Sequence, residues 1–192
     1  NEYPNGLKIF AQYVLLPLLT LYLIILYSYG AKIIISWDWP KGIVSYLISC
    51  VSVLGILTVL LFHPYGHLKN NSWIKKLTRI FYFLLIPLVI ILFIAIGFRI
   101  GDYGITINRY GIVLLGIWLT IIASYFSFAK KNIKLIPISL AIILGLMSFG
   151  PWSMFNVSEK SQTNRLVSIL ENNNLLQNGK IKNEVLWETD SL

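Results

Sequence analysis

The segment Leu77–Phe98, LTRIFYFLLIPLVIILFIAIGF, gives the clearest indication of the fold class. Arg79 is its one charged residue and lies near one end. About 20 apolar residues in a helix cross the hydrocarbon core of a bilayer. Backbone groups in lipid must be paired within a helix or a closed barrel, and barrel strands alternate apolar and polar side chains. This segment does not alternate, so it predicts a membrane-spanning helix.

The composition extends this prediction to most of the chain. Of 192 residues, 56% are hydrophobic and 12% are charged, whereas soluble domains carry about 25% charged residues. Four further apolar runs lie at residues 7–30, 43–62, 110–129 and 133–150. We therefore predict an all-α fold, a polytopic transmembrane helix bundle with about five spans in residues 1–152.

Residues 153–192 are polar enough to lie outside the membrane. We predict a short polar helical C-terminal tail that is capped by Asn156, because Glu159 follows three residues later as in a capping box. The chain begins with Asn rather than Met and shows no cleavable signal pattern. We expect a piece of a longer protein, with a soluble segment that is cut short at Leu192.

Basic residues in the loops predict the orientation. The N-terminal segment, the second loop and the fourth loop share one side and carry Lys8, Lys69, Lys75, Lys76, Arg79, Lys130, Lys131 and Lys134. Fewer basic residues lie near the span ends on the other side. An excess of Lys and Arg marks the cytoplasmic side, so we expect the tail outside the cytoplasm and the protein in a bacterial inner membrane.

The net charge of +8 is spread over short loops. Lysines in such loops contact anionic lipid headgroups. A nucleic-acid partner would require a basic stripe or a recognition motif, and the sequence has neither. Membrane lipids are therefore the expected partners, together with a protein partner or upstream spans of the same chain.

The most polar loop is Phe98–Tyr110, FRIGDYGITINRY. Thr106 stands where the helix of the fourth span needs an N-cap. Arg99 and Arg109 can extend to the headgroups, and Asp102 lies within reach of either arginine. One interpretation is a capped turn with an interfacial ion pair. The other is a site for an anion or a partner, built from two arginines beside a helix N-terminus.

Five spans would place this loop and the tail on the same side of the membrane. The two segments can then meet and form a polar surface that docks a partner domain or binds an acidic headgroup or solute. The candidate binding residues on this surface are Arg99, Asp102, Arg109, Tyr110, Gln162 and Arg165.

Signals for catalysis, metals and cofactors are weak. The sequence has no zinc-binding His-Glu pattern, nucleophile elbow or phosphate loop. His63 and His67 are four residues apart, but Pro64 and Gly66 between them disfavour a helix that would align them on one metal. Cys50 is the single cysteine, which excludes an internal disulfide. We expect no cofactor and no metal site.

These observations lean away from an enzyme and favour a membrane module that scaffolds or senses through the loop-and-tail surface. One alternative is part of a transporter. The cores of these spans carry no ionisable residue, so its charged path would lie in spans that are missing here. The other alternative is a lipid-modifying enzyme that uses Asp102 and Arg109.

Four segments resemble a known family: YPNGLKIFAQYVLLPLLTLY (3–22), WPKG (39–42), RIGDYGITINRY (99–110) and FGPWSMFNVSEKSQTNRL (149–166). Their order and spacing are similar to those of bacterial multi-pass membrane proteins of domain of unknown function 4153. The resemblance covers residues 3–179. It implies a C-terminal portion with further spans upstream, and it supplies no catalytic residues, because the activity of the family is not established.

Overall fold

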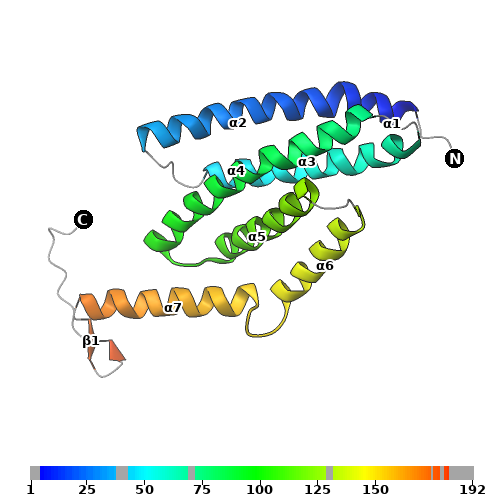
Figure 1. Cartoon of the computed structure of the whole chain (residues 1–192). Helices are drawn as coiled ribbons and strands as arrows, with labels where there is room; N and C mark the ends of the chain where they lie inside the picture. Colours follow the sequence, from blue (N-terminus) through cyan, green and yellow to red (C-terminus); the bar gives the residue numbers. More distant parts are fainter. Residues whose placement is uncertain are drawn as a thin grey trace.

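The computed structural model describes residues 5–37, 43–68, 72–128, 132–173, 175–177 and 180–181. These residues form a bundle of helices followed by a helical tail (Figure 1). The elements are α1 (Asn5–Phe10), the π-helical turn η1 (Ala11–Leu15), α2 (Leu16–Ser36), α3 (Ile43–Leu68), α4 (Ser72–Tyr103), α5 (Ile107–Phe128), α6 (Leu135–Ser148), α7 (Met154–Asn172), β1 (Leu176–Gln177) and β2 (Lys180–Ile181). The two strands pair antiparallel in a small hairpin that the sequence analysis did not predict.

Among the described residues, four helices are long and apolar enough to cross a membrane. They cover Gly6–Ser36, Ile43–Pro64, Lys76–Tyr103 and Ile107–Phe128. The predicted class, an all-α polytopic bundle, is confirmed. The expectation that Pro64 would interrupt the helix is wrong, because α3 continues through it to Leu68. A proline costs one helical hydrogen bond, which is less than an unwound backbone would lose in lipid.

The fifth predicted span is shorter than expected. Its helix, α6, has 14 residues, which corresponds to about 21 Å at the rise of an α-helix and is less than the roughly 30 Å of hydrocarbon in a bilayer. The apolar run continues to Gly150, but the helix ends at Ser148. Phe149, the next residue, has an extended backbone with φ −126° and ψ 152°, which ends the helix, and Gly150 then turns the chain with φ +82°.

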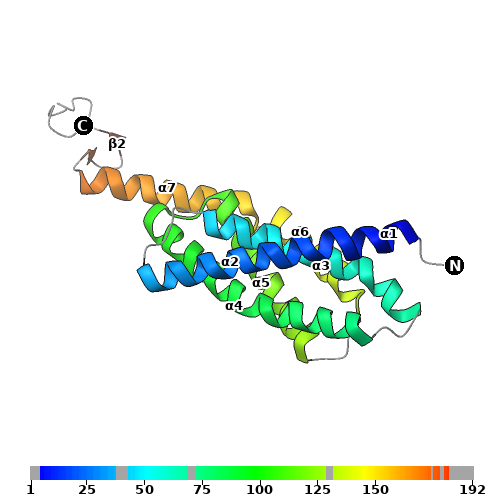
Figure 2. The same ribbon diagram turned by 90° about the horizontal axis from the view of Figure 1, so that it is seen from above.

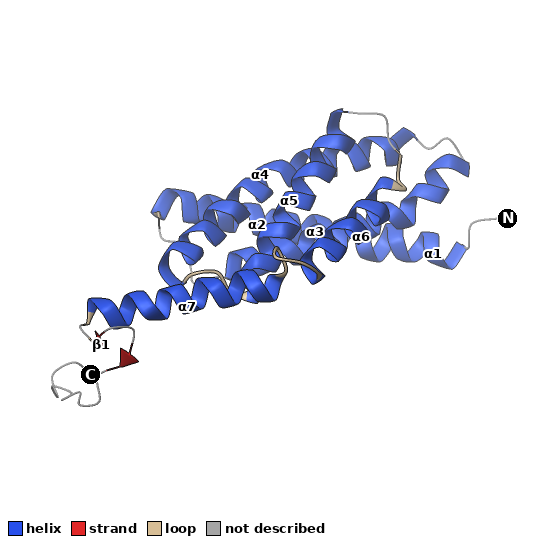
Figure 3. Ribbon diagram, turned by 90° about the horizontal axis from the view of Figure 1, so that it is seen from below, coloured by secondary structure: helices blue, strands red, loops and turns tan. Residues whose placement is uncertain are grey.

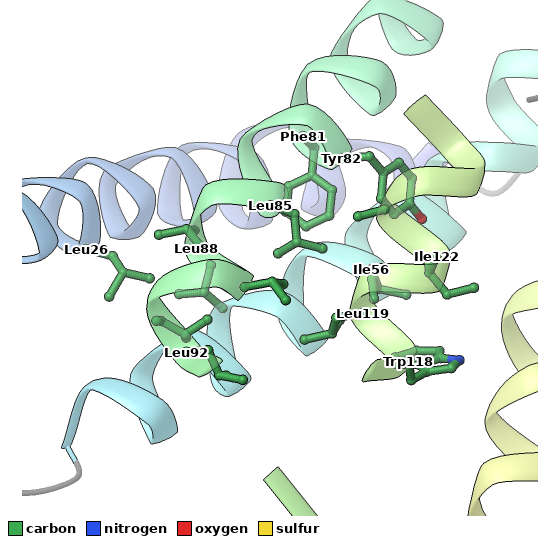
Figure 4. Close-up of a cluster of buried hydrophobic side chains, with 14 of the residues drawn as sticks. Leu26, Ile56, Phe81, Tyr82, Leu85, Leu88, Leu92, Trp118, Leu119 and Ile122 are labelled. Atoms are coloured by element: carbon green, nitrogen blue, oxygen red, sulfur yellow. The ribbon is translucent and has the colours of Figure 1, made fainter. Parts of the chain in front are cut away.

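The core of the bundle is centred on α4, which packs against both α3 and α5. Leu85, Leu88 and Leu92 of α4 are fully buried (Figure 4). They meet Ile56 of α3 and Leu119 of α5 in one hydrophobic cluster. Lipid is as apolar as these side chains, so close packing rather than burial from water must hold the helices together.

Two glycines bring neighbouring helices close to α4. A Cβ atom on Gly55 of α3 would lie 2.1 Å from Cζ of Phe81. A Cβ atom on Gly116 of α5 would lie 2.8 Å from a methyl carbon of Leu92. A side chain at either position would force Phe81 or Leu92 to shift, so these glycines allow α3 and α5 to pack close to α4.

The tail helix α7 follows α6 and returns toward the end of the bundle where α4 passes into α5. Views from above and below show α7 beginning beside the bundle and projecting past that end (Figures 2 and 3). This course brings α7 against the start of α5, although the two segments are more than forty residues apart in the chain.

Candidate functional site

The turn between α4 and α5 is a sharp reversal that leaves backbone groups without hydrogen-bond partners inside either helix. Gly104 has φ +71°, and its N–H donates to the carbonyl of Ile100 at 2.9 Å, as in a left-handed helix C-cap. Thr106 precedes the first residue of α5, and its Oγ1 accepts from the N–H of Arg109 at 3.5 Å. The carbonyls between these two helix ends have no helical partner.

Side chains of α7 supply partners for this turn. Ser161 Oγ accepts from the N–H of Ile105 at 2.9 Å. Gln162 Nε2 donates to the carbonyls of Tyr103 at 3.2 Å and of Ile105 at 3.0 Å. The hydroxyl of Ser158 also donates to Ile105 O at 3.4 Å. The loop and the tail therefore meet, and they do so through the main chain of the turn.

Two further contacts extend this interface at its ends. Arg165 donates from Nη2 to the main-chain carbonyl of Asp102. The hydroxyl of Tyr110 donates to the carbonyl of Trp152 at 2.6 Å, which ties the first turns of α5 to the segment just before α7. We call the set of contacts from Ser158, Ser161, Gln162, Arg165 and Tyr110 the docking interface of α7.

The N-terminal cap of α7 is Ser153, and the predicted cap at Asn156 is wrong. Ser153 has φ −62° and ψ 148°, and its side chain accepts from the N–H of Asn156 at 3.4 Å. Asn156 lies inside the first turn, and its side-chain amide donates to Gly150 O at 3.1 Å. The helix begins three residues earlier than the capping-box pattern indicated. The signal that was missed is a serine, a preferred N-cap residue, directly after Pro151 and Trp152.

The ion pair with Asp102, which belonged to the capped-turn interpretation of this loop, is not formed among the described residues. Arg109 Nη1 donates to the carbonyls of Tyr103 at 3.1 Å and of Gly104 at 2.7 Å. Its guanidinium carbon lies 5.4 Å from the ring centroid of Tyr103, in cation–π range. Within the described part of the chain, the carboxylate of Asp102 makes no ion pair. The carbonyls at the end of α4 carry the negative end of the helix dipole and hold the guanidinium instead.

Beside this turn lies a cavity of about 160 Å³ between α3, α4 and α5. Its lining includes Ser45, Ile96, Arg99, Thr106, Asn108 and Arg109. Ser45 is a residue that the sequence analysis did not identify as a candidate. It is 1% exposed, and its hydroxyl has no hydrogen-bond partner among the described residues.

The structure thus divides the six predicted binding residues into two groups. Arg99 and Arg109 line the cavity. Asp102, Tyr110, Gln162 and Arg165 belong to the contacts between the turn and the α7 region. The two groups meet at the carbonyl of Tyr103, which accepts from both Arg109 and Gln162, but no described residue of α7 lines the cavity.

The fold and these contacts define a polytopic membrane helix bundle with a docked polar tail. The chain belongs to the family described as Domain of unknown function (DUF4153), whose sequence profile matches residues 2–180. It is 26% identical over 172 residues to the uncharacterized protein PM1469 of Pasteurella multocida (strain Pm70). That match covers 85% of this chain and 28% of the relative, so the chain spans little more than a quarter of the curated relative's length. No solved structure matches this chain.

Proposed function

We propose that this domain is a non-enzymatic module of the bacterial inner membrane that scaffolds or senses. In this role it couples the membrane bundle to the polar tail, and through the tail to a protein partner or to other spans of a longer chain. The docking interface of α7 is the observation that carries the proposal. It fixes the tail to the bundle at one defined turn.

The type of bond supports this coupling. Ser161 and Gln162 bond to main-chain atoms of the turn, at 2.9 to 3.2 Å. Such bonds depend on where the backbone of the turn lies, and the turn joins the ends of α4 and α5. A shift of either helix would therefore alter the bonds that orient α7, which gives the tail a means to report the state of the bundle.

Exposed apolar side chains of α7 support a partner role. Phe155, Leu166 and Ile169 are 56%, 57% and 47% exposed. Large apolar side chains that remain exposed on a polar helix are typical of contact surfaces. The enzyme alternative has less support from geometry, because Arg109 lines the cavity beside the turn and Asp102 is not among the described lining residues.

The first test concerns topology. In a Cys50→Ser background, single cysteines at Asp102 and Asn164, both exposed positions, should react from the same side of the membrane with an impermeant maleimide. Labelling from opposite sides would exclude the docking interface in the membrane and with it the proposed function.

The second test concerns coupling and uses native mass spectrometry of the full-length protein. The variant combines Ser161→Ala with Gln162→Ala, and the control is Thr163→Ala, an exposed residue of the same helix. We expect a protein partner that travels with the wild type and the control to be lost from the double variant. A partner retained equally by all three proteins would show that α7 docking is not used.

A further inference from the structure

The cavity between α3, α4 and α5 is positively charged. Arg99 and Arg109 both line it, and no Asp or Glu is among its described lining residues. Arginine stays protonated in proteins. Arg99 is half-buried and makes no hydrogen bond within the described residues. Arg109 uses one guanidinium nitrogen for the turn, which leaves other N–H donors available.

The start of α5 adds to this positive character. Thr106 caps the helix, and Thr106 and Asn108 both line the cavity. The first amides of a helix have no intrahelical acceptor and carry the positive end of its dipole. Two guanidinium groups beside such a helix end form an arrangement that suits an oxyanion.

Ser45 provides an independent indication of a ligand. It lines the cavity from α3, is 1% exposed, and has a buried hydroxyl without a partner among the described residues. By contrast, Ser49 and Ser52 in the same helix each donate to the carbonyl four residues earlier, at 2.7 Å. Buried polar groups normally have a partner. Ser45 is therefore a residue at the wall of a cationic cavity whose buried hydroxyl has no partner among the described residues.

We propose that this cavity binds one phosphate group, either of an anionic lipid headgroup or of free inorganic phosphate. Arg99 and Arg109 supply the charge, and Ser45 and the N-terminus of α5 supply further donors. A volume of about 160 Å³ holds several water molecules, which suits a tetrahedral oxyanion. The site lies where one apolar helix ends and the next begins, which is where a spanning segment is expected to reach the lipid headgroups.

This proposal goes beyond the proposed function, because no residue of α7 lines the cavity in the described chain. The test uses the full-length protein in mild detergent. Phosphatidylglycerol binding is followed by native mass spectrometry, and inorganic phosphate binding by calorimetry. The principal variant is Arg99→Gln. Its control is Arg79→Gln, which removes the same charge from an exposed position near the other end of α4.

We expect Arg99→Gln to weaken binding by at least about tenfold, because a charged hydrogen bond is lost. Arg79→Gln should change affinity by less than about twofold, since exposed charges contribute little. Ser45→Ala should weaken binding several-fold, and Ser49→Ala, whose hydroxyl is satisfied within its own helix, should not. Arg99→Lys keeps the charge and should retain part of the affinity. Partial binding by this variant would show that the loss in Arg99→Gln comes from the missing charge and not from misfolding.

Binding of phosphatidylglycerol alone, with this dependence on Arg99, would identify a lipid headgroup as the ligand. Binding of inorganic phosphate with the same dependence would identify a free anion. Equal losses in Arg99→Gln and Arg79→Gln, or no binding of either probe, would overturn the proposal. The double variant Ser161→Ala and Gln162→Ala should bind normally, so failure of this site and failure of the proposed function can be told apart.

Discussion

Gly104 links the turn to α7, and its substitution by alanine tests that link. Gly104 has φ +71°, and a Cβ atom there would lie 3.0 Å from Gln162 Nε2 and 3.3 Å from Ser161 Oγ. Two other glycines separate the causes. Gly150 has φ +82° but no atom within 4 Å of its Cβ position, and Gly101 lies within α4 with no such neighbour. Gly104→Ala therefore reports backbone strain together with a close contact to α7. Gly150→Ala reports backbone strain alone, and Gly101→Ala reports neither effect.

The expected magnitudes follow from these environments. A left-handed backbone costs a non-glycine residue about 1–2 kcal/mol, which is the whole expected effect of Gly150→Ala. Gly104→Ala adds the displacement of Gln162, whose two hydrogen bonds contribute about 1 kcal/mol each. The expected loss of unfolding free energy is then about 3–4 kcal/mol when both bonds are lost. Gly101→Ala should gain about 0.5–1 kcal/mol, because alanine is the better helix former.

The assay is denaturant unfolding in detergent micelles, followed by tryptophan fluorescence, together with hydrogen exchange at the amide of Ile105. That amide donates to Ser161 Oγ at 2.9 Å, so its protection reports docking directly. Gly104→Ala should speed its exchange, and Gly150→Ala should affect it much less. The reasoning is refuted if Gly104→Ala and Gly150→Ala lose equal stability and leave the Ile105 amide equally protected.

Three further predictions concern the fold. Gly55→Ala should lower the free energy of unfolding by about 1–3 kcal/mol in a denaturant titration, because its Cβ would lie 2.1 Å from the ring of Phe81. The control is Gly97→Ala, which has open space around its Cβ position and should be tolerated. Equal losses of stability in the two variants would contradict close packing of α3 on α4. Ser153→Ala should cost about 1 kcal/mol and speed hydrogen exchange in the first turn of α7, since it removes the N-cap; unchanged exchange there would show that Ser153 is not the cap. Ser139→Ala should lower the melting temperature by a few degrees, because Ser139 Oγ accepts from Trp118 Nε1 at 2.9 Å and this bond connects α6 to α5. The control is Ser148→Ala, since Ser148 is an exposed serine of α6 that bonds to its own helix; this variant should melt like the wild type.

Local sequence patterns were sufficient to predict the class of the protein and the approximate position of its helices. The hydropathy of a run such as Leu77–Phe98 is a sum over its own residues, and lipid allows few backbone structures other than a helix. The same local logic placed Thr106 at the start of α5. It also indicated that the loop and the tail share one side of the membrane, where the structure finds them in contact.

Local patterns misjudged details that depend on competing partners. Asp102 and Arg109 are close enough in sequence to suggest an ion pair, but the carbonyls of Tyr103 and Gly104 hold the guanidinium. Asn156 fits a capping pattern, but Ser153 precedes it and takes that position. Arg109 had a carboxylate and main-chain carbonyls as possible acceptors, and α7 had two possible N-caps, all within a few residues. Only the folded geometry selects between them.

The division of the polar groups between two places depends on packing between segments that are far apart in the chain. It assigned Gln162 and Arg165 to a docking interface and Arg99 and Arg109 to a cavity. Ser45 shows the reason most clearly. It is a serine in the same helix as Ser49, and nothing in the sequence separates the two. The packing of α4 and α5 against the start of α3 buries the Ser45 hydroxyl beside two arginines from more than fifty residues away, and such long-range contacts leave no periodic signal in the chain.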